Sequence, residues 1–168
     1  MSTLNLVLLF PMMFILHDVE EILVQHRWML SHRERLMLKF PSMRSMVEHL
    51  SHLNTRAFAL AAAEELLLIV LATGYVLSDG IYGVEIWSAL FMAFFIHLWV
   101  HLLQAVMVRG YVPGLITSCL LLPFTFIMMK SMMHSMNGWE LMAWGILGVV
   151  FMVANLRLAH WLGIHLCK

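Results

Sequence analysis

Five apolar stretches constrain this chain more than any other feature, because each has about the 20 residues that a helix needs to cross a bilayer. They cover residues 3–24, 57–77, 84–108, 112–133 and 139–158, and the last pattern continues as a helix to residue 165. Within a bilayer only helices and closed barrels satisfy every backbone hydrogen bond. The sequence therefore predicts an all-α polytopic membrane protein that forms one integral membrane domain over residues 1–168.

The composition excludes the common soluble classes. Asp, Glu, Lys and Arg make up 12% of the residues and hydrophobic residues 62%, whereas a soluble domain has about 25% charged residues. Ten basic and ten acidic side chains leave no net charge, which excludes a strongly basic nucleic-acid-binding protein. Cys119 and Cys167 form no CxxC pair, so neither a disulfide framework nor a thiolate metal site is indicated.

The connections between the stretches predict the topology. All are short except residues 25–56, and short connections place consecutive helices antiparallel in an up-and-down bundle. In a five-helix arrangement nine of the ten Lys and Arg residues fall on one side, and Lys130 alone lies near the other. Positive charge marks the cytoplasmic side. We therefore expect a multi-pass protein of the cell inner (plasma) membrane, with the N-terminus outside and the C-terminus in the cytoplasm.

Residues 25–56 alternate basic and apolar side chains and contain Pro41. This pattern is typical of an amphipathic helix that lies in the membrane interface, and proline would break it at that point. We interpret the segment as a cytoplasmic interfacial linker. A docking surface for another protein or for anionic lipid is the alternative.

Ionisable side chains recur inside the apolar stretches, where each costs several kcal/mol and needs a partner. The first stretch contains His17, whose helical face also carries Glu20 and Glu21 at i+3 and i+4. The others contain Glu64 and Glu65, the i, i+4 pair His97 and His101, and His160.

Depth in the bilayer brings several of these groups to one level. At about 1.5 Å per residue, His17 lies roughly 12 Å below the cytoplasmic boundary, Glu64 roughly 13 Å and His101 roughly 10 Å. Chance placement would scatter such groups over the bilayer. His160 is expected near the same boundary.

Histidine and carboxylate side chains without thiolates are ligands for Fe, Mn or Zn. The candidate metal ligands are His17, Glu20, Glu21, Glu64, Glu65, His97, His101 and His160. Because this set exceeds the needs of one tetrahedral ion, we expect a dinuclear site, with iron favoured and zinc or manganese as alternatives. The other interpretation is a metal-free network of paired polar groups that helps the helices to associate.

Two short motifs resemble those of the HXXEE family of small bacterial integral membrane proteins. His17-Asp18-Val19-Glu20-Glu21 matches the motif that names the family, and Tyr111-Val112-Pro113-Gly114 matches its second signature, YXPG. The resemblance covers the chain from the first through the fourth stretch. It implies that His17, Glu20 and Glu21 act together with a further histidine, His97 or His101, and it adds Tyr111 as a candidate catalytic residue. It implies no particular activity.

The YXPG motif also has a local interpretation. Pro113 suits the first turn of a helix and Gly114 permits close packing, so the motif is equally compatible with a tight cytoplasmic turn. Tyr111 either donates a hydrogen bond to a ligand or substrate or anchors the chain at the interface, and the second role is the usual one for membrane tyrosines.

Together these patterns predict an integral membrane metalloprotein, with three functions open. The first is a di-iron oxidoreductase that acts on a lipid-soluble or small hydrophobic substrate and uses an electron donor or a homo-oligomer as partner. The second is a zinc hydrolase that depends on metal-bound water, because GxSxG and HExxH are absent. The third is a non-catalytic membrane partner, sensor or transporter with a structural polar cluster.

Overall fold

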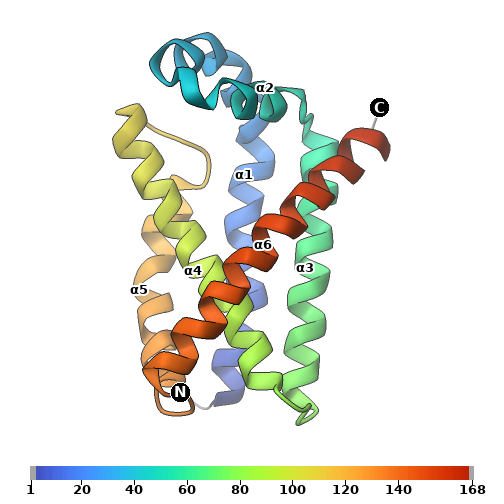
Figure 1. The fold of residues 1–168 in the computed structure, drawn as a ribbon, viewed down its shortest axis with the longest axis vertical. Coiled ribbons are helices and arrows are strands. Elements are labelled where there is room, and N and C mark those ends of the chain that lie inside the picture. The colour runs from blue at the N-terminus through green and yellow to red at the C-terminus, as the bar shows by residue number, and fades with distance from the viewer. Residues whose placement is uncertain (1–2, 167–168) are drawn as a thin grey trace.

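The computed structural model describes residues 3–166, with side chains from Val7 onward, and this part of the chain contains helices and no strand. The elements are α1 (Thr3–Lys39), the 3-10 turn η1 (Pro41–Met43), α2 (Arg44–His52), α3 (Thr55–Leu77), α4 (Gly83–Val108), α5 (Leu115–Met132) and α6 (Gly138–Leu166). Figure 1 shows the long helices running in alternating directions, with the two ends of the chain at opposite ends of the bundle. The predicted all-α class is confirmed.

Four helices, α3 to α6, are long and apolar enough to cross a membrane. Three of them contain the predicted stretches 57–77, 84–108 and 139–158, whereas α5 begins three residues later than the stretch 112–133 and ends one residue earlier. The chain is thus a membrane protein by the length and composition of its helices. Residues 84–108 form one unbroken helix in α4, as the absence of proline and glycine there predicts. The first stretch lies in α1, which continues to Lys39, and its role as a fifth span stays a prediction.

Residues 25–52 fold over one end of the bundle as a hairpin made of the last turns of α1, η1 and α2 (Figure 1). The helix breaks at Pro41, as predicted. Lys39 Nζ donates to the Met107 carbonyl at 2.7 Å and Arg35 to the Val108 carbonyl at 3.3 Å. These basic groups satisfy carbonyls at the C-terminal end of α4. They therefore fix the hairpin to the bundle.

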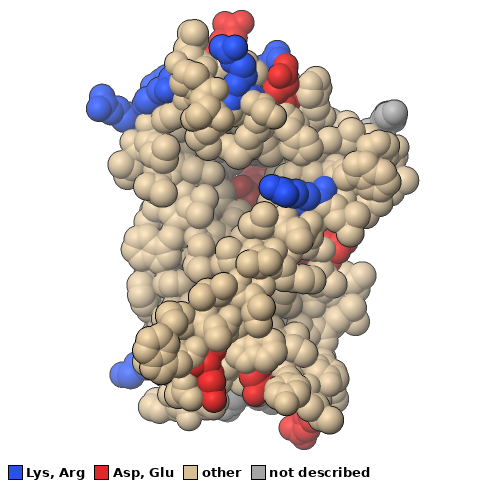
Figure 2. Space-filling model, in the orientation of Figure 1, with Lys and Arg blue, Asp and Glu red and all other residues tan. Residues whose placement is uncertain are grey.

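Basic side chains predominate at one end of the molecule and acidic side chains at the other. Figure 2 shows Lys and Arg gathered over the hairpin together with some acidic side chains, and mostly Asp and Glu at the opposite end. Asn137 and Glu140 form a reciprocal cap there: the Asn137 N–H donates to Glu140 at 3.0 Å, and the Glu140 N–H donates to Asn137 at 2.9 Å. This pair begins α6 at the acidic end.

Helix α6 crosses α4 and α3 diagonally (Figure 1). Glycines make the crossing possible, because a Cβ atom at Gly148 would overlap the Ala89 carbonyl and one at Gly163 would lie 2.6 Å from the Ala57 carbonyl oxygen. Small residues let membrane helices approach until their backbones touch. The crossing leaves space between α6 and the hairpin.

Candidate metal centre

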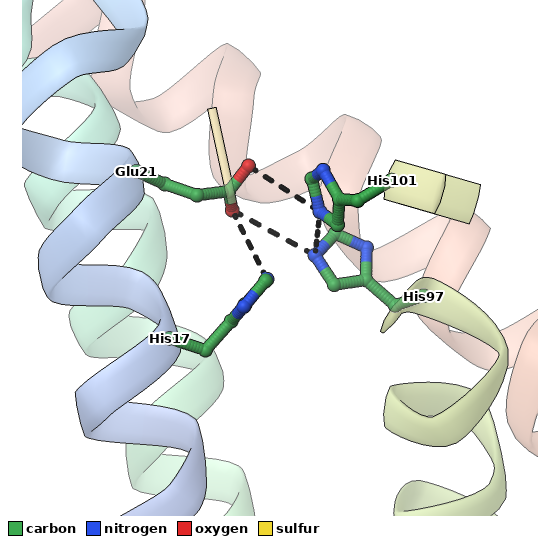
Figure 3. Close-up of side chains that lie close together, drawn as sticks. All are labelled: His17, Glu21, His97 and His101. Atoms are coloured by element: carbon green, nitrogen blue, oxygen red, sulfur yellow. Dashed lines mark hydrogen bonds and ion pairs between the residues drawn. The ribbon is translucent and has the colours of Figure 1, made fainter. Parts of the chain in front are cut away.

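Four polar side chains from α1 and α4 face one another in the interior (Figure 3). His17 and Glu21 are separated by one turn of α1, and His97 and His101 by one turn of α4, so each pair shares a helix face. Each residue offers a ligand atom, and these atoms all lie within 4.8 Å of one another. We call these four residues the donor cluster.

The donor cluster has dimensions that suit one metal ion. Glu21 Oε2 lies 3.9 Å from His17 Nε2 and 3.7 Å from His97 Nε2, and Glu21 Oε1 lies 3.5 Å from His101 Nε2. The two Nε2 atoms of His97 and His101 are 2.9 Å apart. A tetrahedral ion with bonds of about 2.0–2.1 Å separates its ligand atoms by about 3.3 Å. The observed separations lie on both sides of that value.

The donor cluster is mostly withdrawn from the surface. His17 is fully buried, and His101 and Glu21 are 4% and 8% exposed. The His97 side chain is 30% exposed, because it lines a cavity described below. Buried ionisable groups at this depth need compensation, and a bound cation would offset the Glu21 carboxylate.

Hydrogen bonds outside the cluster fix the orientation of His17. Its Nδ1 lies 2.9 Å from Thr117 Oγ1, and that hydroxyl donates its own proton to Glu20 Oε2 at 2.6 Å. The network therefore assigns the imidazole proton to Nδ1, which donates to Thr117 and leaves a lone pair on Nε2. Nε2 is buried without a hydrogen-bond partner and faces the cluster. A metal ligand held in this way is common in metalloproteins.

Glu20 points away from the donor cluster and caps α5. Its carboxylate accepts hydrogen bonds from the Ile116 N–H at 3.3 Å, the Thr117 N–H at 2.8 Å and the Tyr111 hydroxyl at 2.8 Å. A carboxylate at a helix N-terminus satisfies free N–H groups and faces the positive end of the helix dipole. Glu20, which the sequence analysis counts among the candidate metal ligands, thus lies outside the donor cluster.

The YXPG motif packs directly onto the cluster. Gly114 has a φ of +79°, and a Cβ atom there would lie 2.8 Å from Cε1 of His101 and 2.9 Å from Cε1 of His17. The Tyr111 side chain is exposed, and its hydroxyl donates a hydrogen bond to Glu20. Burial, followed by the Glu20 hydrogen bond and charge, raises the pKa of the Tyr111 hydroxyl, so it remains a donor. The two sequence motifs therefore belong to one site.

Three other predicted ligands lie outside the donor cluster. Glu64 accepts a hydrogen bond from Asn155 at 2.8 Å, which joins α3 to α6. Glu65 lines the cavity, and its buried Oε1 has no hydrogen-bond partner. His160 lines the same cavity with its ring 5.5 Å from that of the exposed His49. The structure thus groups four of the eight candidate ligands, and these four are the single such group in the described part of the chain.

A cavity of about 780 Å³ adjoins the donor cluster. Glu21, His97 and His101 form part of its wall, together with Asp18 and Glu65. The hairpin covers it, since Phe40, Val47 and Leu50 also line it. The cluster is therefore accessible to a molecule of substantial size from this side.

Thr117 is a residue of the candidate site that the sequence analysis missed. Its side chain links His17 to Glu20, and it is the third residue of α5 after Gly114. A hydroxyl at this place in the first turn after YXPG is the signal that could have identified it. Other Thr residues in the apolar stretches look the same in composition.

Comparison with protein families gives a match over most of the chain. Residues 8–128 match the family described as "Protein of unknown function with HXXEE motif". The matched region contains both motifs and all four residues of the donor cluster. No curated protein and no solved structure matches the chain.

Proposed function

The chain belongs to the HXXEE family, and we propose that it is a membrane metalloenzyme that holds one transition-metal ion through His17, Glu21, His97 and His101. The arrangement of these four side chains carries the proposal. Three imidazoles and one carboxylate without a thiolate are typical ligands of Fe, Mn and Zn. The cluster is sized for one ion, so we propose one metal ion in place of the dinuclear centre expected from the sequence.

Oxidation or reduction of a hydrophobic molecule in the cavity is the reaction class that we propose. Imidazole and carboxylate ligands with an open position are typical of non-haem iron, and bound iron would supply one-electron and dioxygen chemistry. Such an enzyme requires an electron donor as partner. The mostly apolar cavity wall favours a lipid-soluble substrate.

Zinc-dependent hydrolysis is the second candidate, because zinc held by three of these four residues would keep its fourth position for a water molecule. In both cases this chain's residues have the same roles. Thr117 and Glu20 hold His17 in one tautomer, and Gly114 leaves room for both imidazoles.

We propose that the protein lies in the inner membrane and that α1 is a fifth span. The N-terminus would then be outside and the hairpin on the cytoplasmic side. The basic hairpin and the acidic opposite end support this orientation (Figure 2). A reporter that is active only in the cytoplasm should be active when it is fused to the C-terminus. Activity of a C-terminal reporter that works only in the periplasm would contradict the topology.

Metal analysis tests the proposed function. Protein purified in detergent should contain about one equivalent of metal by plasma mass spectrometry, and an optical spectrum should show whether it is iron. Zinc in place of iron would favour hydrolysis. Protein that binds no metal, even after incubation with Fe²⁺, Mn²⁺ or Zn²⁺, would leave the cluster as a structural polar network.

A further inference from the structure

The cavity beside the donor cluster has the size of a ligand site. Its volume of about 780 Å³ falls within the roughly 300–1,000 Å³ that small-molecule sites occupy. Most of its wall is apolar, with aromatic side chains such as Phe14, Phe58 and Phe94. Such a wall suits a hydrocarbon chain.

The cavity opens sideways through α6, not only toward the hairpin. Phe151 and Val153 of α6 line it and are 47% and 44% exposed. Figure 2 shows a hollow on this face, with an acidic side chain inside it and a basic side chain beside it. With α6 spanning the membrane, as its length and composition indicate, the opening would face lipid. A hydrophobic molecule can therefore enter directly from the bilayer.

One basic side chain, that of Arg157, lies at this opening. Arg157 is the single Lys or Arg among the described residues that line the cavity, and it is exposed. It forms no ion pair or hydrogen bond within the described chain. A free arginine beside an apolar cavity is suited to bind a carboxylate or phosphate.

The position of Arg157 determines which way an anionic ligand lies. Asp18 and Glu65 inside the cavity offer an anionic group no positive charge, so it is attracted to Arg157 at the opening. The hydrocarbon chain then fills the interior and passes the donor cluster. Anionic lipids are also concentrated in the leaflet that faces the basic end of a membrane protein.

We propose that this cavity binds an anionic single-chain lipid, whose head group pairs with Arg157 and whose acyl chain extends toward His97 and His101. The assignment of the chain as substrate rests on the proposed function, but binding itself does not. The proposed orientation of the lipid places the reacting position along the hydrocarbon chain, away from the head group.

Binding of oleate and oleyl alcohol to the purified protein tests the proposal. A fluorescent fatty acid displaced by each lipid gives the affinity, with metal-chelated and metal-loaded protein measured separately. Arg157→Gln should weaken oleate about tenfold, equivalent to about 1.4 kcal/mol, and leave oleyl alcohol nearly unchanged. Arg56→Gln is the matched control, because Arg56 is exposed and does not line the cavity.

A second pair of variants tests the opening. Val153→Trp should weaken both lipids at least tenfold, because the larger side chain narrows the opening. Val150→Trp should not, since Val150 is 62% exposed one turn away and lies outside the cavity wall. These surface positions on α6 are tolerant of size, so folding is preserved.

Several results would overturn the proposal: no oleate binding, unchanged oleate binding in Val153→Trp, or equal losses for Arg157→Gln and Arg56→Gln. Lysophosphatidylglycerol tested beside oleate distinguishes a phosphate head group from a carboxylate. Full metal content without lipid binding would reject this inference and keep the proposed function. Lipid binding by a protein that takes up no metal would do the reverse.

Discussion

Helices α1 and α4 face each other in two regions of different character, one aromatic and one formed by the donor cluster. Toward the acidic end they pack Phe10 against Trp87 and Phe91, with ring centroids 5.5 and 5.6 Å apart. About two to three turns further along each helix, the same faces carry the donor cluster. Phe94 joins the two regions, since its ring lies 5.9 Å from that of Phe14 and 5.7 Å from that of His17.

The comparison indicates what the polar residues are for. The aromatic region pairs α1 with α4 by packing alone, so helix association does not require buried imidazoles and a carboxylate. Such groups are costly in a membrane. Their presence in a pair of helices that can pack without them favours a binding role over a structural one.

The largest effects should come from one substitution in each of the two regions, because each should change a different property of the protein. His101→Ala should lower bound metal at least about a hundredfold, because it removes a ligand, while Phe91→Ala should keep the metal and lose about 3 kcal/mol of stability. Plasma mass spectrometry and thermal unfolding in detergent measure the two quantities. His52→Ala, at an exposed position, serves as the control. A folded His101→Ala protein with full metal content would reject the site.

The next effect concerns the glycine beside the imidazoles. Gly114→Ala should reduce metal affinity tenfold or more, because the added Cβ would displace His17 and His101 and its φ of +79° disfavours alanine. Gly110→Ala is the control in the same loop, since no atom lies within 4 Å of its Cβ position. Equal metal affinities for the two variants would show that the YXPG glycine does not support the cluster.

A smaller effect is expected for the hydrogen bond behind His17. Thr117→Val keeps the shape but removes the acceptor of the Nδ1 proton, and we expect about a tenfold loss of metal affinity. Thr125→Val on the same helix is the control, because Thr125 is buried and bonds only to the Leu122 carbonyl. If both substitutions behave alike, the loss reflects packing of α5 and not the orientation of His17.

The smallest effect should be that of Tyr111→Phe, which removes one hydrogen bond to Glu20. We expect about a fivefold loss of metal affinity, equivalent to about 1 kcal/mol. Because the pKa of Tyr111 is raised above its ordinary value, the hydroxyl keeps its proton below about pH 10 and the loss should be constant between about pH 6 and pH 9. Titrations of metal at several pH values measure this. Tyr82→Phe, at an exposed tyrosine without a hydrogen bond to the site, should have no effect.

The spacing of polar residues along the helices, which can be read from the sequence, predicted the four residues of the donor cluster. It did not predict which other candidates lie outside the cluster. The i, i+4 spacings of His17 with Glu21 and of His97 with His101 fix which side chains share a face. They do not fix the rotation of α3 or α6 about its axis. Glu64 therefore lies outside the cluster and accepts a hydrogen bond from Asn155, and His160 lies outside it with its ring beside that of His49.

Glu20 shows a second limit of the same reasoning. It shares a face with His17, but the free N–H groups at the start of α5 compete for its carboxylate and bind it. Which of two adjacent carboxylates meets a helix end depends on contacts between segments about a hundred residues apart. No local pattern contains that information.

That separation along the chain has a consequence for biogenesis. His17 and Glu21 leave the ribosome long before His97, His101 and Thr117. As the fifth span that we propose, α1 would therefore enter the translocon with ionisable groups that have no partners there. Such a segment is costly to release into lipid. We expect α1 to stay beside the insertion machinery until α4 and α5 are synthesised, and truncations that end before residue 101 to be extracted and degraded.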